Sequence, residues 1–349
     1  MEKIKACIVG ATGYAGQELY RILYSHPYVD IIKVTSVSYT GKKYSDIYQN
    51  LNNISELDCT NEDMETLANL ADVIFVALPH GIASKNVTKS VLDKCKVIDL
   101  GADFRIKDKN VYEEWYKVEH FGEDALKEAV YGLCEIHYDE IKKARLVANP
   151  GCYTTCSILS LYPLVKESLI DVNSIVIDAK SGVTGAGRKA DVGTLYCECN
   201  ESIKAYKVAS HRHTPEIEQE LSYAAGKEIK LIFTPHLTPM NRGILATCYA
   251  KLSGDYDYDK LRRAYLKYYQ DKKYIRLLKE GLFPETNKVK ASEYIDIGFT
   301  IDKRTNTVIV IGAIDNLVKG AAGQAVQNMN LMFGYDETTA LDFAPVYVA

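Results

Sequence analysis

The chain has 349 residues, a formal net charge of −4 and a charged fraction of 25%. This length predicts about two domains, and the balanced charge argues against a nucleic-acid-binding arm or a polybasic membrane patch. No apolar run reaches the roughly 20 residues of a membrane-spanning helix, and no signal peptide precedes the first strand-like run. We therefore expect a cytoplasmic chain with small-molecule partners. Nine cysteines do not form a disulfide pattern, so each is by default a small buried residue.

The first part of the chain alternates short apolar runs with helical periodicity. We expect strands at 4–10, 30–37, 71–78 and 96–101, and helices at 14–26 and 81–95. The apolar runs alternate little, which is typical of strands covered on both faces. The pattern predicts an α/β domain with a Rossmann-type doubly wound parallel sheet over residues 1–149.

The pattern changes after residue 149. Longer and more alternating strands are expected at 174–182, 230–237, 243–252 and 306–315. They predict a second α+β domain over 150–315 with a mixed or antiparallel sheet. The segment 316–349 opens with a helix whose small and apolar positions at 321, 322, 325 and 329 suit close packing, so we expect it to complete the first domain.

The stretch "GATGYAG" joins the first expected strand to the first helix. Its G-x-x-G-x-x-G spacing is one residue longer than the usual dinucleotide fingerprint, but it meets the same needs. The chain must turn tightly, bring backbone N–H groups to a pyrophosphate and start a helix facing that anion. We expect a cofactor here, the alternative being a tight turn without a ligand. The expected contacts are Gly10, Thr12, Gly13, Tyr14, Ala15 and Gly16.

The end of the second strand predicts which dinucleotide binds. An NAD site usually has an acidic residue there for the ribose 2′-hydroxyl. This chain has "TSVSYTGKK", with hydroxyls at Ser36 and Ser38 and cations at Lys42 and Lys43. That set suits a 2′-phosphate and predicts NADP(H), unless the lysines belong only to a solvated loop.

Cys152 follows Asn149-Pro150-Gly151 and precedes a helical stretch at 153–169. A helix N-terminus stabilises a thiolate, so this position favours a nucleophile over a packed thiol. Cys156, one turn further on, is expected in the core.

A reactive thiol needs a partner for proton transfer. "HRHTPEI" offers His211 and His213 just before a helix that Thr214 could cap and Pro215 could open. The alternative is a pair of exposed histidines at a helix entry. A zinc site formed with "CEC" at 197–199 matches no standard ligand spacing, so no metal is expected, and His236 is expected to be structural.

A dinucleotide domain followed by an activated cysteine suggests a particular chemistry. The thiolate adds to an aldehyde, hydride passes to the nicotinamide, and phosphate then releases the resulting thioester as an acyl phosphate. In reverse, NADPH reduces an acyl phosphate to an aldehyde.

Ten motifs run in order along the chain from residue 10 to residue 328: "GATGYAGQEL", "SYTGKKYSD", "FVALPHG", "VIDLGADFR", "VYGLCEI", "NPGCYTT", "SGVTGAGR", "HRHTPEI", "NRGILAT" and "NLVKGAAGQAVQN". Together they resemble the N-acetyl-gamma-glutamyl-phosphate reductase family of arginine biosynthesis. The resemblance implies an aspartate-semialdehyde-dehydrogenase-like fold with an NADP-binding domain and a catalytic and dimerisation domain. It also implies an acyl phosphate substrate, inorganic phosphate as product, and a homodimer or homotetramer.

The resemblance also implies roles for individual residues. Cys152 would be the nucleophile, and either His211 or His213, with a slight preference for His211, would transfer the proton. Arg105 would hold the substrate phosphate, with Asn149 and, as an anion contact, Arg188 also in the substrate site. Ser181 and Gly182 would lie near the cofactor, and Asn316, at the start of the final helix, near the nicotinamide.

Three alternatives remain open at this point. A lysine-pathway relative acting on a carrier-bound aminoadipyl phosphate would keep the chemistry and change the substrate. Aspartate-semialdehyde dehydrogenase fits "HRHTPEI" and "GATGYAG" less well. A dinucleotide-binding regulatory protein without catalysis would not need the nucleophile, the histidines and the arginine together.

Overall fold

The computed structural model describes residues 2–347. The chain divides into two compact units. The first comprises the chain up to Pro150 together with Ala321–Asp342, and the second comprises Gly151–Gly320 together with the described residues from Phe343 onward. Over residues 2–347, no helix is long and apolar enough to cross a membrane.

The C-terminal segment returns to the first unit later than expected. We predicted 316–349, whereas the structure assigns Ala321–Asp342 to that unit. Lys319, just before this boundary, forms a buried ion pair with Glu293 of the second unit. At the other end, the N–H of Val346 donates to the carbonyl oxygen of Lys290. Positions 348 and 349 of the predicted segment lie outside the described residues.

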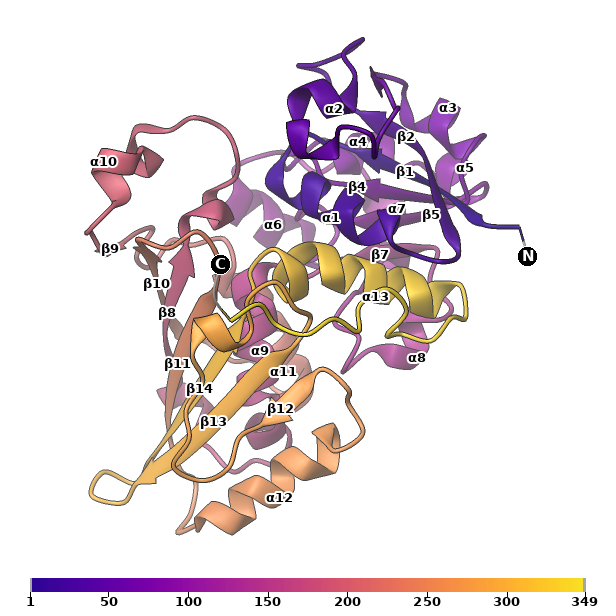
Figure 1. The fold of residues 1–349 in the computed structure, drawn as a ribbon. Helices are drawn as coiled ribbons and strands as arrows, with labels where there is room; N and C mark the ends of the chain where they lie inside the picture. The colour runs from indigo at the N-terminus through magenta and orange to yellow at the C-terminus, as the bar shows by residue number, and fades with distance from the viewer. Residues whose placement is uncertain (1, 348–349) are drawn as a thin grey trace. The chain divides into compact units, whose positions relative to one another are not determined.

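The first unit has a seven-stranded sheet in the order β3-β2-β1-β4-β5-β7-β6, and every pair in it is parallel. Strands β2, β1, β4, β5 and β7 of this sheet are labelled in Figure 1. The predicted doubly wound parallel sheet is therefore confirmed. Its strands are β1 Ile4–Val9, β2 Val29–Thr35, β3 Cys59–Thr60, β4 Val73–Val76, β5 Lys96–Asp99, β6 Val130–Tyr131 and β7 Leu146–Ala148. Its helices are α1 Tyr14–Tyr24, α2 Tyr44–Ile47, α3 Met64–Ala68, α4 Ala83–Asn86, α5 Lys89–Leu92, α6 Lys109–Tyr116, α7 Glu123–Glu128, α8 Tyr138–Ile141 and α13 Gly323–Met332.

The single helix predicted at 81–95 is wrong. Two short helices, α4 and α5, stand there, because Thr88 adopts an extended conformation between them. Its hydroxyl oxygen accepts a hydrogen bond from the N–H of Val91, so Thr88 caps α5 instead of continuing α4. The final helix α13 is preceded by a π-helical turn at Val318–Ala322, and it packs on α1 and β5.

The second unit contains a mixed seven-stranded sheet in the order β12-β13-β14-β11-β8-β10-β9. The pairs β8 with β10 and β12 with β13 are parallel, and the other pairs are antiparallel. The prediction of a mixed sheet is therefore confirmed. Its strands are β8 Val176–Gly182, β9 Lys204–Ala205, β10 Ile232–Thr238, β11 Ile244–Lys251, β12 Ile275–Leu277, β13 Ile295–Asp302 and β14 Thr307–Ile314. Its helices are α9 Cys152–Lys166, α10 Tyr196–Cys199, α11 Thr214–Ala225 and α12 Tyr258–Tyr269.

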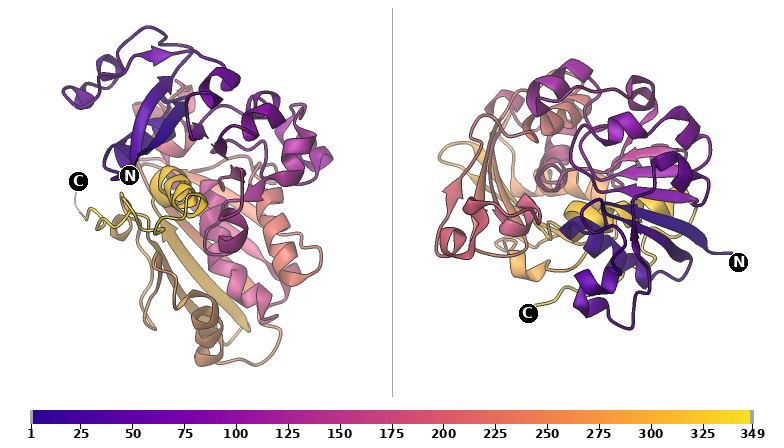
Figure 2. Two further views of the ribbon diagram at one scale, coloured as in Figure 1. Left: turned by 90° about the vertical axis from the view of Figure 1, so that its right-hand side faces the viewer. Right: turned by 90° about the horizontal axis from the view of Figure 1, so that it is seen from above.

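Helix α9 is the core of this unit. It packs on β11 and β14 and against α11 and α12, and α9 and α11 cover the same face of the sheet (Figure 2). Pro163 lies inside α9 and cannot donate to the carbonyl of Leu159. That carbonyl instead accepts a hydrogen bond of 2.9 Å from the hydroxyl of Tyr269 on α12. The helix thus continues through its proline, with Cys152 as its first residue.

Candidate active site

The glycine loop between β1 and α1 has the close backbone approaches that a dinucleotide site needs. Gly10 has a φ of +80°, and a Cβ there would overlap the carbonyl oxygen of Ala77 at the end of β4. A Cβ on Gly16 would lie 2.7 Å from the carbonyl oxygen of Gly10 and from the Cα of Ala11. Both positions therefore require glycine, one for the turn and one for packing the helix on it.

The loop ends at the N-terminus of α1. Gly13 is the N-cap residue and supplies no side-chain cap, and the helix begins at Tyr14. The hydroxyl groups of Tyr44 and Tyr48 donate to the carbonyl oxygens of Ala11 and Thr12, at 2.8 and 2.9 Å, and so hold the loop in place. A helix N-terminus without a side-chain cap, behind a glycine cradle, fits the pyrophosphate of a dinucleotide.

The segment after β2 contains the residues predicted to select the cofactor. Ser36 is buried, and its hydroxyl is 2.9 Å from that of Thr12 in the glycine loop. Ser38 and Lys42 are exposed. Lys43 is also exposed, but its ammonium group pairs with Glu56 at 3.1 Å. Of the two lysines, Lys43 thus has a carboxylate partner that would compete with a 2′-phosphate.

Arg105 and Asn149 both hold the end of the first unit. The Nε of Arg105 donates to the carbonyl oxygen of Asn149 at 2.7 Å, and its Nη2 donates to that of Leu100 at 2.8 Å. The side-chain amide of Asn149 donates to the carbonyl oxygen of Ala321 and accepts from Asn328, both at 3.0 Å. These two buried side chains therefore fix the segment that ends at Pro150.

Asp99, at the end of β5, is a buried acid that the sequence reasoning missed. Its Oδ1 accepts a hydrogen bond of 2.8 Å from the N–H of Gly101. Burial, assisted by the neighbouring carboxylate of Asp103, raises the pKa of Asp99 to about 7. The only sequence signal was an acid that ends an otherwise apolar strand.

Cys152 is the first residue of α9, as predicted, and its side chain is half-buried. The turn before it is held by Glu216 from the first turn of α11. One carboxylate oxygen of Glu216 accepts from the N–H of Gly151 at 2.9 Å and from the hydroxyl of Thr154 at 2.8 Å. Glu216 is fully buried and was not singled out from the sequence, where it is one of several glutamates in a helix. It fixes the turn from which the thiol projects.

His211 and His213 come just before α11, but the expected cap is wrong. The N-cap residue is His213, which makes no side-chain cap hydrogen bond, and Thr214 is already helical. The backbone N–H of His213 instead donates to the Nδ1 of His211 at 3.1 Å. This hydrogen bond orders the turn that leads into α11.

The imidazole of His211 is enclosed by aromatic rings. Its centroid lies 5.6 Å from that of Tyr153, the residue after the cysteine, and 5.3 Å from that of Phe233. Burial is the main reason that the pKa of His211 falls to about 2, and positive charge on nearby side chains adds to it. His211 is therefore neutral at pH 7. Because its Nδ1 accepts a hydrogen bond, its Nε2 carries the proton, and the ring can act as a hydrogen-bond donor.

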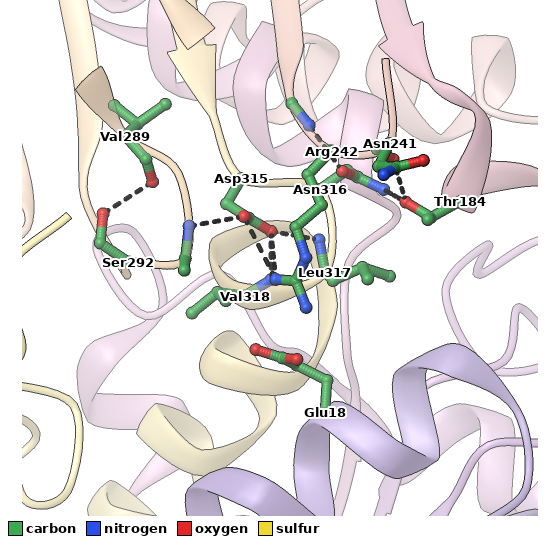
Figure 3. A network of polar contacts seen from close by, with 12 residues as sticks. Glu18, Thr184, Asn241, Arg242, Val289, Ser292, Asp315, Asn316, Leu317 and Val318 are labelled. Carbon is green, nitrogen blue, oxygen red and sulfur yellow. Dashed lines mark hydrogen bonds and ion pairs between the residues drawn. The ribbon is translucent and has the colours of Figure 1, made fainter. Parts of the chain in front are cut away.

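Gly182 and Asn316 organise the loops of the second unit. A Cβ on Gly182 would lie 2.6 Å from the carbonyl oxygen of Asn241, so the two loops touch through backbone. The amide oxygen of Asn316 accepts from the N–H of Gly243 at 2.8 Å, and its Nδ2 donates to the hydroxyl of Thr184 at 2.9 Å (Figure 3). Asn316 precedes the π-helical turn and does not start the helix, contrary to the prediction.

The other predicted residues vary in their surroundings. Ser181 is buried beside Gly182, whereas Arg188 is exposed on the loop that follows. Cys156 is fully buried as predicted, and burial raises the pKa of its thiol to about 12. The Nδ1 of His236 lies 3.0 Å from Asp178. Among residues 2–347, no three histidine, cysteine or acidic side chains are placed to hold a metal ion together.

The structure thus brings the predicted residues together in two groups, one in each unit. In the first unit Thr12 of the glycine loop contacts Ser36, and in the second unit His211 and His213 lie beside the ring of Tyr153, the residue after Cys152. A glycine loop before a helix and a cysteine at a helix N-terminus are features that dehydrogenases with a cysteine nucleophile combine.

Comparison with known proteins agrees with this class. Residues 5–144 match a model described as semialdehyde dehydrogenase, NAD binding domain, and residues 152–316 match one described as semialdehyde dehydrogenase, dimerisation domain. The fold is that of aspartate semialdehyde dehydrogenase II from Vibrio cholerae complexed with ASA, with a TM-score of 0.72, 16% identity, and coverage of 96% of this chain and 99% of that one. Aspartate semialdehyde dehydrogenase with NADP from Candida albicans has a TM-score of 0.65 and 17% identity, and the match covers 95% of this chain and 99% of that one. The chain is therefore of the semialdehyde dehydrogenase class.

Relatives at higher identity define the family within that class. N-acetyl-gamma-glutamyl-phosphate reductase from Lachnoclostridium phytofermentans is 56% identical over 344 residues, 99% of each chain. The protein of that name from Campylobacter jejuni is 57% identical over 343 residues, 98% of each. The chain belongs to the N-acetyl-gamma-glutamyl-phosphate reductase family, which confirms the resemblance of its motifs.

Proposed function

We propose that this chain reduces N-acetyl-glutamyl 5-phosphate to N-acetyl-glutamate 5-semialdehyde, with NADPH as reductant and release of phosphate, in arginine biosynthesis. The observation that carries the proposal is the placement of Cys152 at the N-terminus of α9, on a turn held by Glu216, in a chain with relatives of that name. A thiol in this position is favoured as a thiolate and can form a covalent acyl intermediate.

The reaction begins when the Cys152 thiolate attacks the acyl carbon. A carbon–sulfur bond forms, the bond from the acyl carbon to the phosphate oxygen breaks, and phosphate leaves with the electron pair. The enzyme is then held as a thioester. NADPH, when bound, supplies the hydride that reduces this acyl carbon.

The histidines act on the oxygen of the reduced intermediate. Hydride addition leaves an oxyanion, the deprotonated form of a thiohemiacetal, on the carbon bound to Cys152. Its oxygen becomes a carbonyl again when the carbon–sulfur bond breaks and sulfur leaves with the electron pair as the thiolate. His211, neutral with its proton on Nε2, is suited to donate a hydrogen bond to that oxygen. We assign the proton transfer to His211 or His213, with His211 preferred.

The site that we propose for the pyrophosphate and the 2′-phosphate of the cofactor lies on the first unit. The N-terminus of α1 and the loop of Gly10 to Gly16 would hold the pyrophosphate, and Ser36, Ser38, Lys42 and Lys43 would accept the 2′-phosphate of NADP. From the family resemblance we also assign Ser181, Gly182 and Asn316 to the cofactor side, and Arg105, Asn149 and Arg188 to the substrate side. The assembly that we propose is a cytoplasmic homodimer or homotetramer, supported by the match to a dimerisation domain.

The substrate is tested by a direct comparison. NADPH oxidation is followed with N-acetyl-glutamyl phosphate, with aspartyl phosphate and with a carrier-bound aminoadipyl phosphate, each at the same concentration. We expect turnover with the first to exceed that with the others by orders of magnitude. Turnover with either competitor and none with the first would overturn the substrate assignment, and NADPH binding without turnover on any of them would indicate a regulatory protein.

A further inference from the structure

The segment between β14 and α13 forms an unusual turn beside the nucleophile. The chain leaves β14 at Ile314 and enters a π-helical turn at Val318–Ala322, in which the N–H of Gly320 donates to the carbonyl oxygen of Asp315 at 3.0 Å. Single π-helical turns are uncommon and are often found at functional sites. The turn widens the backbone so that Gly320 faces the start of α9.

Gly320 touches Cys152 directly. An ideal Cβ on Gly320 would lie 2.7 Å from the Cβ of Cys152 and 3.2 Å from its Cα. Carbon atoms in contact are about 3.5–4.0 Å apart, so no side chain fits here unless the cysteine moves. The backbone of Gly320 is therefore the wall against which the nucleophile's side chain is placed.

The side chain of Asp315 holds the turn that carries Gly320. The fully buried carboxylate accepts hydrogen bonds from the N–H groups of Leu317 and Val318, at 2.8 and 3.0 Å, which cap the turn (Figure 3). Its other oxygen accepts from the N–H of Ala291 at 2.7 Å and lies 3.3 Å from Arg242. Asp315 thereby ties the turn to the loop before β13 and to the loop before β11.

Lys319, the residue before Gly320, anchors the same turn through a buried ion pair. Its ammonium group is fully buried and lies 3.2 Å from the buried carboxylate of Glu293. Removing one partner of such a pair leaves an uncompensated charge in the interior, which is strongly unfavourable. The ion pair therefore holds the residue before Gly320, in addition to the hydrogen bonds of Asp315.

We propose that Gly320 is a positioning residue for the nucleophile, and that the turn held by Asp315 and Lys319 sets the place of the Cys152 side chain. This inference rests on the proposed function, in which Cys152 attacks an acyl carbon. Cys152 is the first residue of its helix and has no preceding helical turn to confine its side chain, so neighbours from other segments must do so. A displacement of about 1 Å at a reacting group can lower the rate by about 10²-fold.

The test compares two glycines that contact the same helix. Gly320→Ala places a methyl group against Cys152, and the control Gly312→Ala places one against Cys156 and Ser160, further along α9. We expect Gly320→Ala to lower kcat by about 10²-fold and to change the rate and the pH profile of Cys152 alkylation by iodoacetamide without cofactor. Gly312→Ala should lower Tm but leave that pH profile unchanged. Equal effects of the two variants on alkylation would overturn the proposal.

A second measurement does not depend on turnover. In a Cys152→Gly background the methyl group of Gly320→Ala has no Cβ to meet, so its effect on Tm should become clearly smaller than in the parent chain. An equal loss of Tm in both backgrounds refutes the contact. If Gly320→Ala does not fold, Asp315→Asn, which replaces the acceptor facing Ala291, should change the alkylation profile in the same direction, and an unchanged profile would count against the proposal. Failure of the proposed function would appear separately, as full activity of Cys152→Ser.

Discussion

The clearest test of the site concerns Glu216, which holds the turn before Cys152. Glu216→Ala removes the acceptor of the Gly151 N–H and one acceptor of the Thr154 hydroxyl. The hydroxyl can still donate to the carbonyl oxygen of Gly151, 2.5 Å away. The backbone N–H loses the acceptor that it has in this structure, in a buried position.

The size of the effect follows from these contacts. A buried donor left without an acceptor costs about 1–3 kcal/mol, and the loss of a buried methylene group adds about 1 kcal/mol. We therefore expect Glu216→Ala to lower the free energy of unfolding by about 2–4 kcal/mol. Because the loosened turn carries the nucleophile, kcat should also fall by about 10²-fold.

Urea unfolding and NADPH-coupled turnover measure the two effects. The matched control is Glu216→Gln, whose amide oxygen can still accept from Gly151, and which should unfold within about 1 kcal/mol of the parent. If Glu216→Ala unfolds like the parent chain and turns over at the parent rate, the turn is not held as the structure indicates, and the reasoning is refuted.

Three further predictions concern the nucleophile, the cofactor and a buried acid. Cys152→Ala should abolish turnover and leave NADPH affinity nearly unchanged, as measured by titration; parent-level turnover would exclude the covalent mechanism. Lys42→Ala with Lys43→Ala should raise KM for NADPH much more than KM for NADH, with the larger part from Lys42 because Lys43 pairs with Glu56; a chain that prefers NADH contradicts this. Asp99 has a pKa raised from 3.8 to about 7, so the folded state keeps its proton longer and stability should fall as pH rises through this window. Asp99→Asn should flatten that slope in urea unfolding, and an unchanged slope would show that another group causes it.

Local features of the sequence were enough for strands β1, β2, β4 and β5 of the first unit, for the position of the glycine loop and for the place of Cys152, but not for the short strands β3, β6 and β7. Apolar runs and glycine spacing specify a strand or a turn within a few neighbouring residues, and Pro150-Gly151 separates one element from the next. These features can therefore be recognised in the sequence itself. Local patterns failed where a side chain chose between two local hydrogen bonds. Thr88 broke the helix predicted at 81–95, and α11 begins at Thr214 with His213 as its N-cap residue and no side-chain cap, where a cap from Thr214 was expected.

Only the tertiary structure decided what surrounds the cysteine. Glu216 accepts a hydrogen bond from Gly151, 65 positions earlier in the sequence, and Gly320, which contacts Cys152, is the last residue of the segment that begins at Gly151. Such contacts depend on how α9, α11 and the turn after β14 pack together. The residues in these contacts show no repeating pattern in the sequence, so the contacts cannot be predicted from it. The sequence by itself thus determined which residue is the candidate nucleophile, because the start of a helix is a local feature. The fold decided what holds that residue, because the contacts of Cys152 come from segments far away in the sequence.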